Sequence, residues 1–271
     1  MTAAENPAPG IHDHILVSCL MVTLGRAERF GFIETSVAAY LAQLHPRKEL
    51  IVVINGGLAA AQDALVAYLH SLNRSDIKIV QPAGLLTLGQ LRNIACEAAT
   101  GEVICQWDDD DLYHPLRLSA QLNALMEGPY EAAVLQDVMQ YVPHLRAMYW
   151  TNWHATPCGA HPGTLMARRV VPLSYPESGD TAAKGEDTYV LLQLQQRNLV
   201  KTIQAMPHLF IYISHGGNTW DAAHHEMLIA RLSISRKLLL KREANIRAGL
   251  LAFGFGPDVA IHGHNGLAFK L

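Results

Sequence analysis

The sequence predicts an α/β protein built on an open, mostly parallel β-sheet flanked by helices. Short runs of β-branched and aliphatic residues recur along the first half of the chain, stretches with apolar residues at helical spacing separate them, and Gly, Pro or Asn stands at many junctions. Strands and helices that alternate in this way form parallel sheets. The chain has 271 residues, 50% of them hydrophobic, which is enough to bury a large core.

The first half contains four predicted strands and three predicted helices. Continuous apolar runs predict strands at 15–22, 50–54, 77–80 and 103–107. Apolar stripes predict helices at 33–44, 60–72 and 87–101. The third helix begins with Thr87 and Gln90, which have the spacing of a capping box, and ends at Gly101. Ligands of such sheets bind at the carboxyl ends of the strands, so the loops after Val22, Ile54 and Trp107 are the expected site.

The second half alternates less regularly. Strands are predicted at 132–139, 146–150, 164–167 and 209–213, with longer loops between them, and we expect them to extend the same sheet. A helix is predicted at 184–198, and a long helix at about 221–247. The segment with His262 and His264 is expected to be a flexible tail. No internal repeat and no linker marks an independent second domain.

Composition and charge narrow the class of protein and its expected location. The formal net charge is −3, so no global basic field favours nucleic acid. The four cysteines form no CxxC pair, as is typical of reduced thiols. The N-terminal lead lacks a basic start followed by an apolar run, and no apolar stretch reaches the ~20 residues that span a bilayer. We expect a cytoplasmic protein.

The predicted C-terminal helix carries a basic segment. Its charged residues are Arg231, Arg236, Lys237, Lys241, Arg242 and Arg247 against Glu243. A basic helix with leucines can lie on an anionic membrane, which would place the protein at the inner membrane face. A packed helix with a solvated basic face is the more common alternative.

Four aspartates, Asp108 to Asp111, follow the strand that ends near Trp107. So much like charge at one strand end is unfavourable unless a cation or a network of donors neutralises it. Carboxylate ligands suit Mg²⁺ or Mn²⁺, which commonly bridge protein carboxylates to the phosphates of a substrate. The alternative is a solvated acidic turn that caps the next helix.

Two further motifs carry polar side chains toward the expected site. Glu186 and Asp187 open the helix predicted at 184–198, where the helix dipole should keep Asp187 ionised and able to accept a proton from a hydroxyl. Simple helix capping is the alternative. His215 stands in the loop HGGNTW and is either a metal or phosphate ligand or a solvated side chain.

Several other residues have weaker signals. The segment 161–164 is predicted to be a tight turn before a strand, although it could line a pocket. Trp150, Trp153 and Trp220 could stack on a sugar ring, but tryptophans more often pack in the core or at its rim. His224 and His225 are expected at the surface.

Together these motifs resemble the family 2 glycosyltransferases of GT-A fold. The resemblance lies in the order of the strand leading to TLGR, the segments LAQLHPRKELIVVINGG and LRNIACEAATGEVICQWDDDDLYHP, then GED and HGGNTW. It covers about residues 15–220 and implies a Rossmann-like GT-A domain with a nucleotide-sugar half at 15–115 and an acceptor half at 116–220. A lead at 1–14 precedes it, and a helical extension with the tail, 221–271, follows it.

The resemblance also implies roles for individual residues. Asp187 matches the inverting catalytic base, with Glu186 supporting it. The acidic run looks like the family's Asp-x-Asp element, with Asp108 and Asp110 in the motif positions and Asp111 following, and His215 is similar to a C-terminal metal or diphosphate ligand. The residues that would contact the nucleotide are Thr23, Arg26, Asn55, Arg92, Asp108 and Asp109. The chain departs from the family pattern at Val22, Gly25 and Asn55.

The implied reaction moves a sugar from a nucleoside-diphosphate sugar, most simply a UDP-sugar, to a hydroxyl of a glycan or lipid-linked acceptor, with Mn²⁺ or Mg²⁺ as cofactor. Synthesis of bacterial-type surface polysaccharide or glycoconjugate is the expected setting. Two alternatives remain open: a nucleotidyltransferase of related fold, for which no Gly-rich phosphate-binding loop is present, and a non-catalytic binding module, which would not need GED. The oligomeric state, homodimer included, is open.

Overall fold

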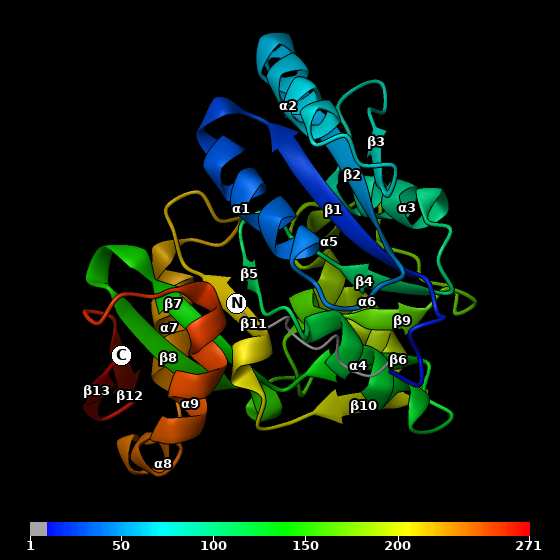
Figure 1. Ribbon diagram of the computed structural model, residues 1–271. Helices are drawn as coiled ribbons and strands as arrows, with labels where there is room; N and C mark the ends of the chain where they lie inside the picture. The colour runs from blue at the N-terminus through cyan, green and yellow to red at the C-terminus, as the bar shows by residue number, and fades with distance from the viewer. Residues whose placement is uncertain (1–9) are drawn as a thin grey trace, which may run out of the picture.

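The computed structural model describes residues 10–271, and they form two β-sheets with helices packed around them (Figure 1). The larger sheet has seven strands in the order β10-β6-β9-β4-β1-β2-β3. They are β1 (Val17–Gly25), β2 (Lys48–Gly57), β3 (Ile77–Val80), β4 (Val103–Gln106), β6 (Ala132–Leu135), β9 (Met166–Arg168) and β10 (Val200–Ile203). Only β9 runs antiparallel to its neighbours, β4 and β6. The mostly parallel sheet predicted from the sequence is confirmed.

The second sheet is a finding that the sequence did not predict. Its six strands lie in the order β13-β12-β8-β7-β11-β5. They are β5 (Leu112–Tyr113), β7 (Asp137–Val142), β8 (Ala147–Asn152), β11 (Phe210–Ile213), β12 (Ala260–Gly263) and β13 (Gly266–Lys270). The strands of the second half were expected to extend one sheet. Three strands of the second sheet, β7, β8 and β11, come from segments predicted as strands, and β12 and β13 come from the predicted tail. The second half of the chain therefore builds an opposite wall rather than a wider sheet.

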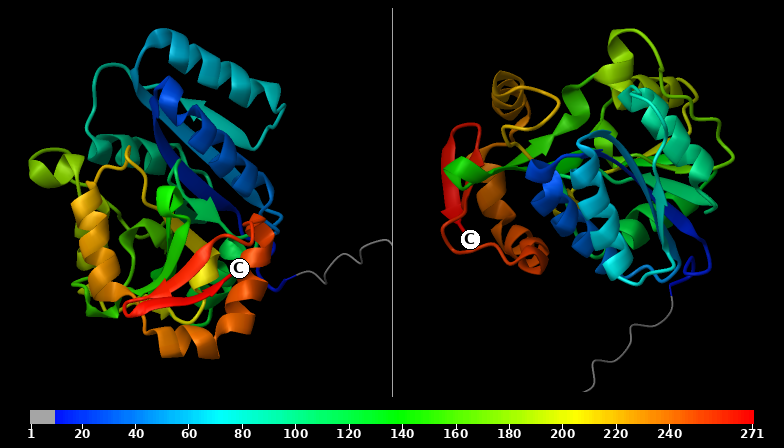
Figure 2. Two further views of the ribbon diagram at one scale, coloured as in Figure 1. Left: turned by 90° about the vertical axis from the view of Figure 1, so that its left-hand side faces the viewer. Right: turned by 90° about the horizontal axis from the view of Figure 1, so that it is seen from above.

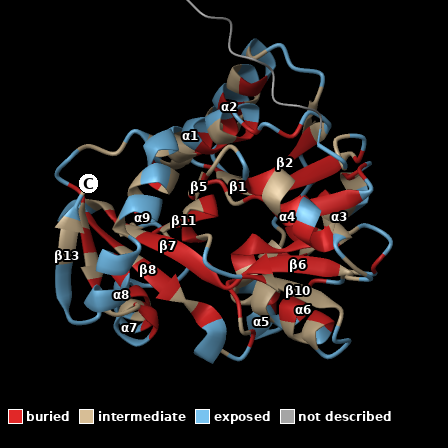
Figure 3. Ribbon diagram, turned by 60° about the horizontal axis from the view of Figure 1, so that its bottom comes forward, coloured by how far each residue is buried: buried red, intermediate tan, exposed pale blue. Residues whose placement is uncertain are grey.

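Both faces of the larger sheet are buried because helices cover each of them (Figure 2). Alternate residues of β1 and β2 face two separate cores, as the two-residue period of a strand requires. One face packs on α1 (Phe30–Leu41), α2 (Ala59–Ser71) and α4 (Arg117–Met126). The other packs on α3 (Leu88–Ala98) and α6 (Glu186–Gln195), with the short α5 (Asp180–Ala183) beside them. Figure 3 shows the buried strands enclosed by the exposed surfaces of the helices.

The start of α3 confirms its predicted capping box. The Thr87 hydroxyl accepts the amide of Gln90 at 3.3 Å, and the Gln90 side-chain oxygen accepts the amide of Thr87 at 2.9 Å. These reciprocal bonds satisfy two amides that a helix end leaves free. They fix the start of the helix that carries Arg92.

The chain passes from one sheet to the other in the middle of the strand predicted at 132–139. Gln136 separates β6 from β7, and the two strands belong to different sheets. Asp137 fixes this crossing because its carboxylate accepts the indole N–H of Trp150 at 2.8 Å and the amide of Ala205 at 2.7 Å. Gln136 and Asp137 interrupt the apolar residues here, but the residues on both sides are buried, so the pattern did not separate one strand from two.

The C-terminal part of the chain corrects two predictions. The long helix expected at 221–247 is three helices, α7 (Ala222–Leu232), α8 (Arg236–Lys241) and α9 (Glu243–Leu250). Ser233 ends α7, and Ser235 caps α8 by accepting the amide of Leu238 at 3.3 Å. The expected flexible tail is the hairpin of β12 and β13, in which β12 pairs with β8. In the part of the chain that the structure describes, no helix is both long and apolar enough to span a membrane.

Candidate active site

A cleft of about 660 Å³ opens between the two sheets, at the carboxyl ends of β1 and β4. The acidic run forms its floor because Asp108 to Asp111 lie on the crossing from β4, in the first sheet, to β5, in the second. The first turn of α6 and the loop after β11 form further walls. The structure thus brings three of the motifs singled out in the sequence, the acidic run, GED and HGGNTW, to one cavity.

The backbone of the acidic run is held from two sides. The carbonyl oxygen of Asp108 accepts the hydroxyl of Ser36 at 2.9 Å and that of Tyr113 at 2.8 Å. The indole of Trp107 is fully buried and donates to the Ser36 carbonyl at 3.3 Å. The carboxylates therefore project from a fixed segment rather than from a solvated turn, which was the alternative left open by the sequence.

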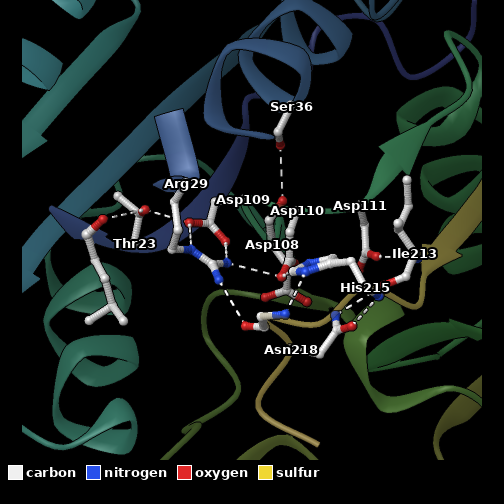
Figure 4. Close-up of polar contacts among 12 residues, drawn as sticks. Thr23, Arg29, Ser36, Asp108, Asp109, Asp110, Asp111, Ile213, His215 and Asn218 are labelled. Atoms are coloured by element: carbon white, nitrogen blue, oxygen red, sulfur yellow. Dashed lines mark hydrogen bonds and ion pairs between the residues drawn. The ribbon is translucent and has the colours of Figure 1, made fainter. Parts of the chain in front are cut away.

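Arg29 neutralises much of the acidic run (Figure 4). Its guanidinium pairs with Asp109 through two nitrogens, one of them Nε at 3.0 Å, and donates to Asp110 Oδ2 at 2.9 Å. A third nitrogen donates to the Gly217 carbonyl at 3.2 Å. The four adjacent aspartates predicted a cation or donor network at this place, but no pattern in the sequence identified Arg29. The residue lies in a short 3₁₀ turn (Ala27–Arg29) directly after β1, and that position next to a strand end was the available signal.

Asp109, Asp110 and Asp111 have different partners, and their pKa values therefore shift in different directions. Burial, and then the charge of Asp110, raise the pKa of Asp109 to about 6, although Arg29 and the Thr23 hydroxyl bond to it. Burial also acts on Asp110, but His215 and Arg29 outweigh it and lower its pKa. Burial and the neighbouring carboxylates hold the pKa of Asp111 well above its usual range, although the amide of Ile213 donates to it at 2.9 Å.

His215 joins the acidic run to the loop after β11. Its Nε2 lies 3.0 Å from Asp110 Oδ2, and its ring stacks on Phe32 with centroids 4.3 Å apart. Its Nδ1 accepts the amide of Gly217 at 3.0 Å, so the hydrogen-bond network assigns the ring proton to Nε2. His215 is therefore placed beside the carboxylates, as the sequence analysis expected of a candidate ligand, and is not a solvated loop histidine.

Asp110 and His215 fit a divalent cation that a substrate would help to hold. A carboxylate and an imidazole nitrogen suit Mn²⁺, and such ions commonly take their remaining ligands from phosphates and water. Among residues 10–271, no group of three or more His, Cys, Asp and Glu side chains is arranged to hold a metal unaided. Asp111 accepts the amide of Ile213, and Asp108 accepts Arg92 at 3.0 Å, so these two carboxylates already have partners within the protein.

Arg92 connects the acidic run to the GED motif. It is buried, and it donates to Asp108 Oδ1 at 3.0 Å and to Glu186 Oε1 at 2.6 Å. Glu186 is buried as well, which makes it a partner of Arg92 rather than a group free to react. Arg92 and Glu186, predicted for nucleotide contact and for support of the base, thus lie side by side at the wall of the cleft.

Asp187 lines the same cleft and has no ion pair among the described residues. Its Oδ1 accepts the amide of Thr188 at 2.6 Å. The helix dipole was expected to keep Asp187 ionised, and burial, followed by the charge of Glu186, opposes this by raising the pKa of Asp187 to about 6. The carboxylate is still mostly ionised at neutral pH and is basic enough to accept a proton.

Two of the predicted nucleotide contacts lie elsewhere. Arg26 is exposed and does not line the cleft. Asn55 is buried and shapes the loop after β3: its amide donates to the Gly84 carbonyl at 2.8 Å, and its oxygen accepts the amide of Leu86 at 3.2 Å. Asn55 thereby positions Leu86, which does line the cleft. Thr23 also lines it, with its hydroxyl committed to Asp109.

Aromatic and imidazole rings line one end of the cleft. His161, predicted to lie in a tight turn, precedes the 3₁₀ turn Pro162–Thr164 and also lines the cleft, with Trp153 at a ring distance of 4.4 Å. Burial lowers the pKa of His161 to about 3, so its ring is neutral. His225 was expected at the surface but is buried, because α7 packs against β8.

A stack of three side chains borders this end. Lys184 lies over the ring of Trp220 at 4.0 Å, and Trp220 stacks on His224 with centroids 4.2 Å apart. Trp220 is 37% exposed, so one edge of a large aromatic surface remains open to the cleft and to solvent. Of the tryptophans considered, Trp150 and Trp153 are core residues and Trp220 is the open one.

Comparison with known proteins identifies solved structures of similar fold and a matching sequence family. Over 89% of its length the chain superposes on the structure of S. aureus TarS 1-349, covering 76% of that chain, with a TM-score of 0.56 and 14% identity. It also superposes on the mannosyltransferase PcManGT from Pyrobaculum calidifontis, solved with GDP-Man and Mn²⁺, over 86% of this chain and 64% of that one, with a TM-score of 0.54 and 16% identity. No curated protein matches the sequence. Residues 18–164, more than half of the chain, match the family described as Glycosyl transferase family 2, and the chain therefore belongs to that family.

Proposed function

We propose that this protein is a metal-dependent, inverting glycosyltransferase that moves a sugar from a nucleoside-diphosphate sugar to an acceptor hydroxyl. One observation carries the proposal: the Asp187 carboxylate, with a pKa of about 6, lines the same cleft as the acidic run, whose Asp110 contacts His215. A pocket that only bound a nucleotide sugar would not need a half-buried carboxylate with a raised pKa beside Glu186.

The donor would lie over the acidic run. Structural neighbours of this chain include TarS in complex with UDP-GlcNAc and PcManGT in complex with GDP-Man and Mn²⁺, which supports a nucleotide-sugar donor here. We infer a UDP-sugar as the first candidate. Asp108 and Asp109 would face the nucleotide, with Arg92 and Thr23 holding those two carboxylates in place.

Asp110 and His215 would hold Mn²⁺ or Mg²⁺ together with the diphosphate, and Asp111 would add a further carboxylate beside Asp110. The ion would supply positive charge to the phosphate oxygens as the nucleoside diphosphate departs. Without such a cation, a diphosphate would add negative charge to a cleft already lined by six carboxylates, which are Asp108, Asp109, Asp110, Asp111, Glu186 and Asp187. This charge excess is the physical reason to expect metal dependence.

Asp187 would act as the base. As the acceptor oxygen forms its bond to the anomeric carbon, the bond from that carbon to the diphosphate oxygen breaks, and the acceptor proton passes to Asp187. A single displacement of this kind inverts the anomeric configuration. Arg92 would keep Glu186 in place, so that the first turn of α6 holds Asp187 toward the acceptor.

The acceptor would enter at the aromatic end of the cleft. Trp220 offers an exposed ring edge at this end, since Lys184 and His224 lie over its ring, and an acceptor would pack against that apolar edge. Lys184 beside it would favour an acceptor that carries an anionic group, such as a lipid-linked diphosphate or an acidic glycan. We keep a glycan or lipid-linked acceptor of a surface polysaccharide or glycoconjugate as the proposed class.

The basic C-terminal segment would then bring the enzyme to an anionic membrane. On α8, Leu238 and Leu240 are 40% and 41% exposed and stand among Lys237, Lys241 and the following Arg242. We expect flotation with vesicles that contain phosphatidylglycerol but not with pure phosphatidylcholine. The double variant Lys237→Glu and Lys241→Glu should abolish it, and flotation that survives this change would remove the segment from membrane binding.

A panel of nucleotide sugars tests the function as a whole. Each donor is incubated with Mn²⁺ and the protein, and release of free nucleoside diphosphate by slow hydrolysis is measured. We expect release from one donor, with none in the presence of a chelator. Tight binding of a donor without any hydrolysis would favour the binding module, and release of inorganic diphosphate from a sugar phosphate and a nucleoside triphosphate would favour the nucleotidyltransferase.

A further inference from the structure

The guanidinium of Arg29 lies against Asp109 and Asp110, where a cation is needed to balance the charge of the acidic run. Its guanidinium makes two bonds to the Asp109 carboxylate, one to Asp110 Oδ2 and one to the Gly217 carbonyl. The side chain is only 16% exposed, so these bonds form largely out of contact with water. Buried charge pairs of this kind are stable only when both partners are satisfied.

Arg29 and a divalent cation cannot both use the same oxygen of Asp110. Oδ2 already accepts Arg29 at 2.9 Å and His215 Nε2 at 3.0 Å, which uses both of its lone pairs. A cation bound there must displace at least one of these donors. It would also lie next to the positive charge of the guanidinium, which opposes its binding.

His215 adds a second obstacle from the loop after β11. The ring proton sits on Nε2, the nitrogen that would bind a metal, while Nδ1 accepts the amide of Gly217. Arg29 bonds to the carbonyl of the same Gly217 at 3.2 Å. Arg29 thereby fixes both the carboxylate and the turn that presents the imidazole.

We propose that Arg29 is an internal counter-ion that competes with the divalent cation for Asp109 and Asp110, so that the metal enters readily only together with a diphosphate. The diphosphate offers the guanidinium a new anionic partner, and Arg29 can then leave the carboxylates without becoming an unpaired buried charge. This inference rests on the proposed metal dependence. It makes Arg29 a positioning residue that couples metal binding to donor binding.

The test measures Mn²⁺ binding directly, from the electron paramagnetic resonance signal of the free ion, with and without UDP. Arg29→Met removes the charge, and Arg29→Gln removes it while keeping a hydrogen-bond donor, so the Gln variant carries the test if the Met variant does not fold. Arg74→Met is the matched control. Arg74 also pairs with an aspartate through two nitrogens, at 2.8 and 2.7 Å from Asp76, but outside the cleft.

We expect both Arg29 variants to bind Mn²⁺ without nucleotide at least tenfold more tightly than wild type and Arg74→Met. The gain in Mn²⁺ affinity caused by UDP should shrink in the same variants. Equal affinities in all four proteins would overturn the competition while leaving metal dependence intact, and weaker binding in the Arg29 variants would show that Arg29 supports the metal site instead. No Mn²⁺ binding by any of them, even with UDP, would overturn both the competition and the proposed metal dependence.

Discussion

The Nε atom of Arg92 lies 2.6 Å from Oε1 of Glu186, and this buried ion pair joins α3 to the first turn of α6. The same guanidinium donates to Asp108 at 3.0 Å. One arginine therefore holds the start of the acidic run and the helix that carries Asp187. Removing one member of a buried ion pair costs about 3–5 kcal/mol, so substitutions that keep the hydrogen bonds are the informative ones here.

Asp187→Asn should abolish transfer while donor binding persists. The amide keeps the size of the side chain but cannot take a proton, so we expect the turnover number to fall by a factor on the order of 10² or more. Donor affinity, measured by calorimetry with Mn²⁺, should stay within about twofold of wild type. Asp180→Asn, an exposed position on the neighbouring α5, is the matched control. Near-normal turnover in Asp187→Asn would remove this residue from the mechanism.

The turnover number should decline below about pH 6, because Asp187 must be ionised to act as a base and its pKa is about 6. Glu186 raises that pKa through its negative charge. Glu186→Gln removes the charge but keeps an oxygen for Arg92, so the decline should move to lower pH by roughly half to one unit. The exposed Glu97→Gln on α3 should leave the profile in place. A profile that does not move in Glu186→Gln would assign the decline to another group, Asp109 being the first to test.

Local patterns in the sequence predicted six of the seven strands of the larger sheet, which lie in short apolar runs, whereas β10, with the sequence VKTI, was not predicted. The capping box at Thr87 was also predicted, and the predicted strand at 77–80 coincides with β3. The second sheet could not be predicted in this way. Its formation depends on breaks at Gln136 and at the acidic run, where polar residues mark an interruption but do not show that the next strand joins another sheet.

The residues of the candidate site could be predicted where they come directly after a strand or at the start of a helix. Asp108 to Asp111, Asp187 and His215 all line or border one cleft, as the positions of their motifs suggested. Arg29 was missed because its role depends on where a flexible side chain reaches from a 3₁₀ turn, which no spacing rule gives. Asn55 follows a strand end as well, yet its amide bonds to the neighbouring loop, because short polar side chains readily bind nearby backbone.

Asp110→Ala should abolish the enhancement of nucleotide binding by Mn²⁺. Asp110 is the carboxylate that contacts His215, and its lowered pKa keeps it ionised across the neutral range. We expect UDP to bind Asp110→Ala equally with and without Mn²⁺ in calorimetry. The exposed Asp63→Ala on α2 should behave as wild type. An enhancement that survives in Asp110→Ala would place the cation elsewhere in the cleft.

Asp187→Asn should also make the protein more stable at neutral pH. This effect tests the raised pKa of Asp187 without depending on activity. The pKa of Asp187 is about 6 in the folded protein and close to 4 in the unfolded chain, so the folded state binds more protons between these values. In wild type this contribution to stability is present below about pH 4 and is lost as the pH rises through 6. Asparagine is neutral at every pH, so the Asp187→Asn variant does not lose this stability as the pH rises.

The free energy of unfolding, measured by urea denaturation, should therefore be about 1–2 kcal/mol higher for Asp187→Asn than for wild type at pH 7.5, after allowance for solvent screening. The two proteins should converge as the pH falls to 4, where Asp187 itself is protonated. Asp180→Asn, at an exposed site, should follow wild type throughout. A gain in the free energy of unfolding that is the same at pH 4 and pH 7.5 would come from packing of the amide. The absence of any gain at pH 7.5 would show that Asp187 has no desolvation cost and hence no raised pKa.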